Sequence, residues 1–157
     1  NLKIVTDAAS IALTYISHVR ALSHFARIGL AMAATLSGDV RSATEQYSAL
    51  STHRKVLAYP GGPSSDRVLG RLATTIGKRK EADMHFKDAI AFCRVSRFQP
   101  EHAWSLHDYA GALAVSYRQS DRAQARALLA EAETLATACS MRPLLEKIGT
   151  VRQRIRG

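Results

Sequence analysis

The side chains that most often act in catalysis or metal binding are scattered along this chain. It has six histidines and two cysteines in 157 residues. His18 and His24 are six positions apart and His102 and His107 are five apart, so neither pair lies on one helix face as well as an i, i+4 pair would. No H-E-x-x-H motif is present, and no cysteines lie at zinc-ligand spacing. We therefore expect no metal ion and no cofactor.

The remaining reactive groups also lack a catalytic pattern. The segments 61–65 and 77–79 contain glycine but do not match the phosphate-binding G-x-x-x-x-G-K-[ST] motif. Cys93 and Cys139 lie among alanines and other small or apolar residues, which is the usual setting of a reduced structural thiol. We expect His85 to face either solvent or a neighbouring helix. The sequence therefore predicts that the chain is not an enzyme.

Apolar residues recur at three- and four-residue intervals over most of the chain, which predicts helices. Glycine, proline and helix-capping residues divide this pattern into segments. We expect Gly38 and Gly77 just past two helix ends, and Asp39 and Ser120-Asp121 at the caps of two others. The two prolines and two glycines within 58–66 predict a loop. The predicted helices span about 2–17, 21–37, 39–56, 65–76, 79–97, 100–117, 122–138 and 143–155. Short connections imply antiparallel hairpins. The predicted fold class is therefore all-α.

Small residues repeat at a similar spacing in successive hairpins. Second helices carry alanines that lie 39 and then 43 residues apart: Ala43, Ala82 and Ala125. First helices carry small residues at matching places: Ala31, Gly70 and Ala110. Small side chains let two helices cross closely. Large side chains that would fill the space between hairpins follow the alanines by four positions: Tyr47, Phe86 and Leu129. A fixed period of this size indicates stacked helical hairpins.

This pattern resembles the tetratricopeptide repeat. The second copy, with Leu69-Gly70, Ala82, Phe86 and Ala89, has the family's spacing, whereas the first has Ala31 in place of glycine. The resemblance implies an α-solenoid of about eight helices in a right-handed superhelical array. We expect one domain over 1–157, divided into a truncated repeat, three repeats and a capping helix: 1–20, 21–57, 64–97, 100–139 and 143–156.

A narrower resemblance covers most of the chain. It rests on the runs 69–73, 89–94 and 100–110, with 127–136 and Met141-Arg142-Pro143-Leu144-Leu145-Glu146 near the end. These runs look like the repeat region toward the C-terminus of large bacterial signalling proteins. That group includes LuxR/MalT-like ATP-dependent regulators and AAA-type ATPases fused to adenylyl or guanylyl cyclase domains. There the repeat region is a sensor or scaffold, and other domains do the chemistry. Ser140 stands where the family has glycine.

The chain carries a formal charge of +9 that is spread along its length. Basic clusters occur at Lys78-Arg79-Lys80 and at Arg152, Arg154 and Arg156. Nucleic-acid binding is a lower-ranked alternative, because no aromatic platform or recognition helix accompanies these clusters; arginine-rich solvated helix faces explain the charge more simply. No apolar run approaches the ~18 residues that span a membrane, and 1–20 lacks signal-peptide features. We expect a cytoplasmic location.

The first helices of successive hairpins line the concave surface of a solenoid. On that basis the predicted partner-binding groove comprises Ile28, Met32, Arg67, Arg71, Trp104 and His107, with Phe25, Ser64 and Gly111 beside them. Such a groove is apolar at one end and basic in the middle. It suits a protein partner or an acidic, amphipathic peptide, which another domain of the same parent could supply. The competing interpretation is that the first helix covers Phe25, Ile28 and Met32, and that Trp104 packs into the core.

These observations predict a non-catalytic interaction, sensor or scaffold domain of a bacterial signalling or transcriptional regulator. The alternative is a self-association module that oligomerises its parent protein. The chain begins without methionine, within an amphipathic segment, so we expect it to be a fragment of a larger protein.

Overall fold

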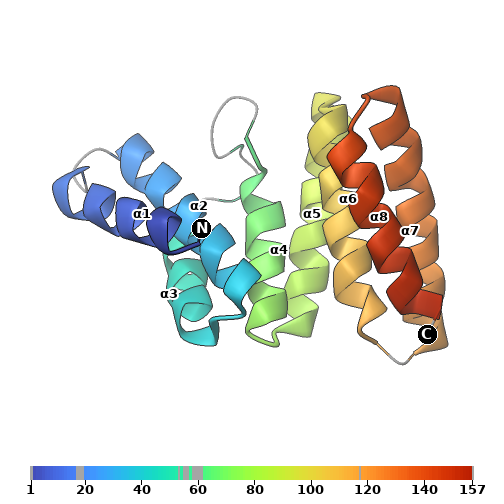
Figure 1. Cartoon of the computed structure of the whole chain (residues 1–157), viewed down its shortest axis with the longest axis horizontal. Coiled ribbons are helices and arrows are strands. Elements are labelled where there is room, and N and C mark those ends of the chain that lie inside the picture. The colour runs from blue at the N-terminus through green and yellow to red at the C-terminus, as the bar shows by residue number, and fades with distance from the viewer. Residues whose placement is uncertain are drawn as a thin grey trace. The chain divides into compact units, whose positions relative to one another are not determined.

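The computed structural model describes residues 2–16, 20–52, 54, 57, 62–116 and 118–156. Eight helices account for nearly all of them (Figure 1). They are α1 (Leu2–Ile16), α2 (Arg20–Ser37), α3 (Val40–Leu50), α4 (Ser65–Thr75), α5 (Arg79–Ser96), α6 (Gln99–Ala114), α7 (Gln119–Ala138) and α8 (Arg142–Arg156). The one β-type pairing in this part of the chain is an isolated bridge between Leu57 and Ser64. The all-α prediction is confirmed.

The chain divides into two compact units, residues 1–85 (unit 1) and 86–157 (unit 2). The division falls inside α5 and therefore inside the expected repeat 64–97. In unit 1, α1 packs on α2, α3 packs on α2 and α4, and α2 also contacts α4. In unit 2, α6 packs on α7 and α8, and α7 packs on α8. None of the described helices is both long enough and apolar enough to cross a lipid bilayer.

Local sequence signals set several of the helix ends. Gly38 and Gly77 adopt φ of 71° and 76° just after α2 and α4, a conformation that glycine reaches at no steric cost. Asp39 caps α3 as predicted, because its carboxylate accepts the Ser42 backbone N–H at 3.0 Å. Ser140 has φ 54°. The turn after α7 thus uses the left-handed conformation that glycine favours, although serine occupies the position.

Three predicted helix ends are wrong. Helix α6 ends at Ala114 rather than near residue 117. Helix α3 ends at Leu50 rather than near residue 56. Helix α7 begins at Gln119, with Arg118 at the capping position, so the predicted cap at Ser120-Asp121 lies inside the first turn. Asp121 instead accepts a hydrogen bond from the Ser116 hydroxyl. The predicted loop within 58–66 falls partly on residues 58–61, which lie outside the described residues, as does His18.

The predicted small residues are buried. In unit 1, Ala31 and Ala43 are fully buried in a core of aliphatic side chains, beside which Tyr47 packs. That core consists of Ile28, Ala31, Ala34, Ala43, Leu50, Val68, Leu69 and Leu72. Gly70 and Ala82 are also buried. Closely crossing helices need small residues at their contact points, and the buried positions are those that the repeat pattern identified.

Unit 2 has its own aliphatic and aromatic core. The Phe86 ring stacks on Tyr109 with ring centroids 5.4 Å apart. Helix α8 buries the residues that share one face, namely Leu144, Ile148, Val151 and Ile155. Helix α7 contributes Ala125, Leu129, Ala132 and Ala136. Arg152 of α8 donates two hydrogen bonds, at 2.8 and 2.6 Å, to the Glu133 carboxylate of α7.

Phe86→Ala is expected to lower the free energy of unfolding by about 3–5 kcal/mol, because it removes a fully buried ring and leaves a cavity. Chemical denaturation measures this loss. Val95→Ala is the control on the same helix: Val95 is exposed, so its replacement should change the free energy of unfolding by less than about 0.5 kcal/mol. A loss below about 1 kcal/mol for Phe86→Ala would contradict the packing described for this ring.

Candidate functional site

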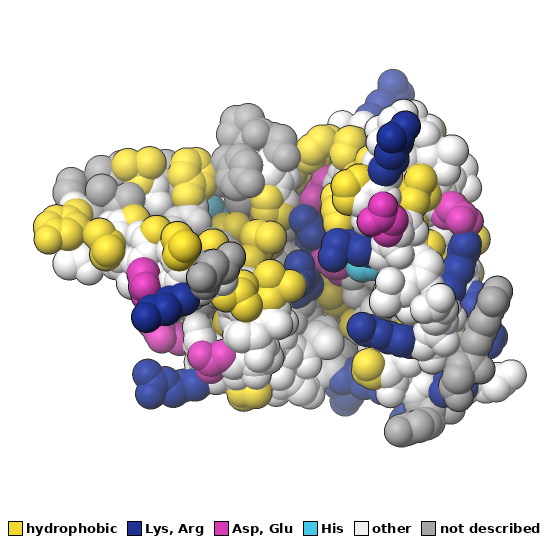
Figure 2. Space-filling view, viewed as in Figure 1, with side chains coloured by type: hydrophobic (Ala, Val, Ile, Leu, Met, Phe, Trp, Pro, Cys, Tyr) yellow, Lys and Arg dark blue, Asp and Glu magenta, His cyan; other side chains and the backbone are white. Residues whose placement is uncertain are grey.

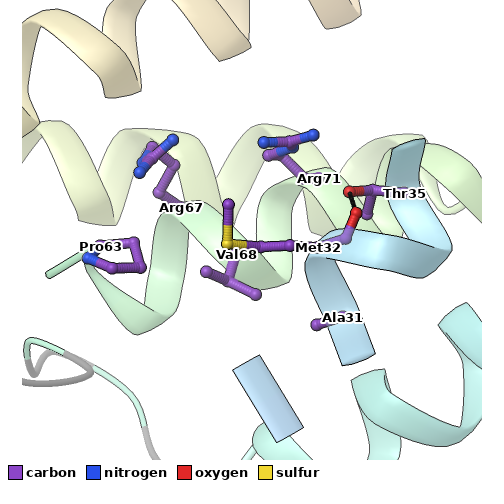
Figure 3. Close-up of a pocket in the computed structure, with 7 residues that line it drawn as sticks. All are labelled: Ala31, Met32, Thr35, Pro63, Arg67, Val68 and Arg71. Carbon is purple, nitrogen blue, oxygen red and sulfur yellow. Dashed lines mark hydrogen bonds between the residues drawn. The ribbon is translucent and has the colours of Figure 1, made fainter. Parts of the chain in front are cut away.

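A small pocket lies between α2 and α4 in unit 1. It is lined by Ala31, Met32, Thr35, Pro63, Arg67, Val68 and Arg71 (Figure 3). The apolar side chains come from both helices and from Pro63, which precedes α4. The pocket therefore combines an apolar floor with two guanidinium groups.

Arg67 and Arg71 lie one turn apart on α4, so their side chains project from the same face of the helix. Figure 3 shows both side chains on one side of α4, while Met32 extends from α2 to Val68. Arg67 is only 8% exposed, whereas Arg71 is half-buried. Ser64 caps this helix by accepting the Arg67 backbone N–H at 3.1 Å. The cap fixes the first turn of α4 and therefore the position of Arg67.

Three of the six predicted groove residues line this pocket: Met32, Arg67 and Arg71. Ile28 does not, because its side chain is buried in the unit 1 core. Helix α1 packs on a different face of α2, where Ala9 meets Ala26 and Leu30. Phe25 and Met32 consequently keep more than a third of their surface exposed. Ile28 is thus buried, as the competing interpretation has it, but within the core cluster of α2, α3 and α4 and not within the cluster that α1 forms with α2.

Trp104 and His107 belong to unit 2, on α6. Their rings meet edge to face with centroids 5.8 Å apart. The Nδ1 atom of His107 lies 3.0 Å from an oxygen of Asp108, and its buried Nε2 has no hydrogen-bond partner among the described residues. Trp104 is half-buried, so it lies at the edge of the core rather than within it. Gly111 has open space where a Cβ would stand.

A hydrogen-bonded chain of three side chains, two of them buried, crosses unit 1, and the sequence did not reveal it. His85 Nδ1 lies 3.1 Å from Asp66 Oδ1, and His85 Nε2 lies 3.1 Å from the Tyr47 hydroxyl. His85 and Asp66 are 2% and 1% exposed. Because an ionised carboxylate only accepts, Nδ1 carries the proton; in the neutral imidazole Nε2 then accepts the Tyr47 O–H. We call Tyr47, Asp66 and His85 the relay.

A basic side chain lies near each end of the relay. Arg54 Nε donates to Asp66 Oδ1 at 3.2 Å, which pairs the buried carboxylate with a cation. The Lys78 ammonium lies 5.0 Å from the centre of the Tyr47 ring. Burial raises the pKa of the Tyr47 phenol, and the negative charge of Glu81 raises it further. The phenol therefore stays protonated at neutral pH and can serve as a hydrogen-bond donor.

The order carboxylate–imidazole–hydroxyl is also found in nucleophilic triads. A nucleophile, however, needs a lowered pKa or an accessible base, and here the phenol has a raised pKa while the imidazole is enclosed. What the relay does is join three helices: α3 through Tyr47, α4 through Asp66 and α5 through His85. His85 thus meets a neighbouring helix rather than solvent. The 39-residue repeat interval, which places Tyr47 level with Phe86, is a signal that Tyr47 lies near His85, but it gives no indication of the contact with Asp66.

No protein-family model, curated protein or solved structure matches this chain. The likeness to tetratricopeptide repeats therefore remains an expectation from the sequence. Function has to be inferred from the pocket, the relay and the surfaces of the two units.

Tyr47→Phe should lower the free energy of unfolding by about 1–3 kcal/mol, because it leaves the buried Nε2 of His85 without its partner. Asp66→Asn should also lower the free energy of unfolding. In the double variant the combined loss should differ from the sum of the two single losses by about 0.5–3 kcal/mol, since both substitutions act through His85. Urea denaturation of the single and double variants provides the measurement. Tyr15→Phe is the control, because that phenol is exposed. Additive effects would show that the three side chains do not act as one chain.

His102 of α6 should make the free energy of unfolding depend on pH. Burial lowers its pKa, against the opposing effect of Glu131, whose Oε1 lies 3.6 Å from Nε2. The unfolded chain then binds a proton more readily than the folded one, so stability is complete above pH ~6.5 and is lost as the pH falls toward the folded-state pKa.

The expected slope from this group is at most about 1.4 kcal/mol per pH unit. Denaturation at intervals between about pH 7 and pH 5 measures it. His102→Gln should flatten this part of the profile. An unchanged slope in that variant would mean that burial of His102 does not penalise its protonation.

Proposed function

We propose that this chain is a non-catalytic interaction domain that binds an acidic, amphipathic segment of a partner protein in the pocket between α2 and α4. The observation that carries the proposal is the placement of Arg67 and Arg71 beside Met32, Val68 and Pro63. Apolar side chains of the partner would contact the floor, and carboxylates would contact the guanidinium groups.

The guanidinium groups suit this role chemically. Each has five N–H donors in a planar fork that matches a carboxylate. It can therefore bind an acceptor from a partner in addition to acceptors of its own chain. Spaced by one turn, Arg67 and Arg71 match two acidic residues one turn apart on a partner helix. The charge of +9 would accelerate encounter with such a segment.

The helix packing supports a repeat architecture for this domain. Helix α2 contacts α3 and also α4, and α6 contacts α7 and also α8, which is how each hairpin of a solenoid meets the next helix. The buried alanines Ala43, Ala82 and Ala125 recur at intervals of 39 and 43 residues, which are longer than the 34 residues of the standard tetratricopeptide unit. We therefore propose a right-handed array of such hairpins, serving as a sensor or scaffold within a cytoplasmic bacterial signalling or transcriptional regulator.

The relay favours a binding role over a catalytic one. Its imidazole and carboxylate are enclosed, so no substrate atom can approach them without opening the core. Asp66 precedes Arg67 directly, and a relay that fixes Asp66 also fixes the first turn of α4. A rigid α4 holds the two arginines in place before a partner arrives, which reduces the entropy lost on binding.

Fluorescence anisotropy with short labelled peptides tests the pocket. The peptides combine leucine with glutamate at helical spacing, and a matched set replaces every glutamate with lysine. The glutamate set should bind, the lysine set should not, and added salt should weaken binding. Arg71→Glu should reduce affinity at least about tenfold. Arg71 is preferable to Arg67 for this test, because replacing the buried Arg67 would also disturb folding.

Arg41→Glu is the matched control, because Arg41 is exposed on α3 and does not line the pocket. Its affinity should stay within about twofold of the unaltered chain. Equal losses in Arg41→Glu and Arg71→Glu would indicate nonspecific attraction to net charge. Equal binding of the glutamate and lysine peptides would exclude the basic pocket.

A further inference from the structure

Helix α1 exposes a stripe of apolar side chains along its length. Ile4, Ile11 and Tyr15 are 66%, 59% and 75% exposed, and Ala8 between them is exposed too. Figure 2 shows hydrophobic side chains gathered over α1. Spacings of four, three and four residues place these side chains on one face of the helix, as in the seam of a coiled coil.

The stripe is not the face that packs inside unit 1. Ala9, Ala12 and Leu13 of α1 make that contact, against Ala26 and Leu30 of α2. The apolar part of α1 therefore extends beyond the part that α2 covers. A helix of a folded domain normally presents one apolar stripe to its core, so the second stripe indicates a second packing partner.

We infer that the second partner is the same stripe on another copy of this chain, packed antiparallel about a two-fold axis. In an antiparallel pairing the residue numbers of facing positions have a constant sum. A sum of 19 places Ile4 against Tyr15 of the other copy and Ala8 against Ile11. Each of the two inner layers then combines a small with a large side chain. A two-fold interface requires this self-complementarity, because each contact occurs twice.

The residues beside the stripe agree with this pairing. Lys3, Asp7, Ser10 and Thr14 form one flank, which would meet the polar flank of the other copy. The stripe itself has no charge, so it does not match the acidic segment proposed for the pocket. With one lysine and one aspartate in α1, the helix also lacks the basic face of helices that lie on membranes.

The exposed area of the stripe indicates a weak dimer. Pooled over two copies, these side chains would form an interface of roughly 1,000 Å², at the lower limit for specific contacts. Sedimentation velocity from about 5 to about 500 µM should therefore show a reversible monomer–dimer equilibrium. Ile11→Glu should weaken the dimer at least about tenfold, and Thr14→Glu on the polar flank should change its Kd less than about twofold.

Ala8→Leu distinguishes specific pairing from general adhesion. The larger side chain adds apolar area, so a face that associates nonspecifically would dimerise more tightly. In the specific pairing, each leucine would face Ile11 of the other copy, crowd the two inner layers and weaken the dimer. Circular dichroism checks that each variant keeps its helical content. The inference would be overturned by any of three results. These are a chain that stays monomeric up to about 500 µM, a tighter dimer in Ala8→Leu, and equal effects of Ile11→Glu and Thr14→Glu on the Kd of the dimer. A monomer that binds neutral phosphatidylcholine vesicles would also overturn it.

Discussion

The hydrogen bond between Asp66 and His85 is the interaction on which the arrangement of unit 1 depends. A carboxylate that is 1% exposed would be strongly destabilising without partners, and here it has the imidazole and the Arg54 guanidinium. The imidazole in turn meets the Tyr47 hydroxyl. Helices α3, α4 and α5 therefore satisfy one another's buried polar groups, which favours one relative placement over the alternatives that aliphatic packing alone would allow.

This placement links the core to the candidate site. Asp66 lies in the first turn of α4, with Arg67 next to it and Arg71 one turn further on. The same helix contributes Val68 and Leu69 to the aliphatic core. Helix α4 is thus held from two sides, by the relay and by the core, while its arginines line the pocket facing α2. Small residues such as Ala31 and Ala43 let the neighbouring helices approach closely enough for these contacts.

The sequence predicted the parts of this structure that follow local rules. Helical periodicity located all eight helices, and Asp39, Gly38 and Gly77 marked ends that the structure confirms. The repeat spacing also identified buried small residues. The α3 end was predicted too late because the period continues past Leu50, and the α7 start was misjudged because Asp121 bonds backward to Ser116 instead of capping the helix. Ile28 was assigned to the groove although it shares a helix face with core residues.

The relay was beyond prediction for a different reason. Most of α4, a short connection and the start of α5 separate Asp66 from His85, and Tyr47 lies on the preceding hairpin, so no local pattern pairs these polar residues. Nitrogen-resolved NMR of the His85 ring tests this link most directly. At about pH 8, where an ordinary imidazole is neutral, we expect a single tautomer with a proton on Nδ1 that exchanges slowly with solvent. In Asp66→Asn this proton should exchange rapidly. A ring that averages rapidly between tautomers, or a spectrum unaffected by Asp66→Asn, would contradict it.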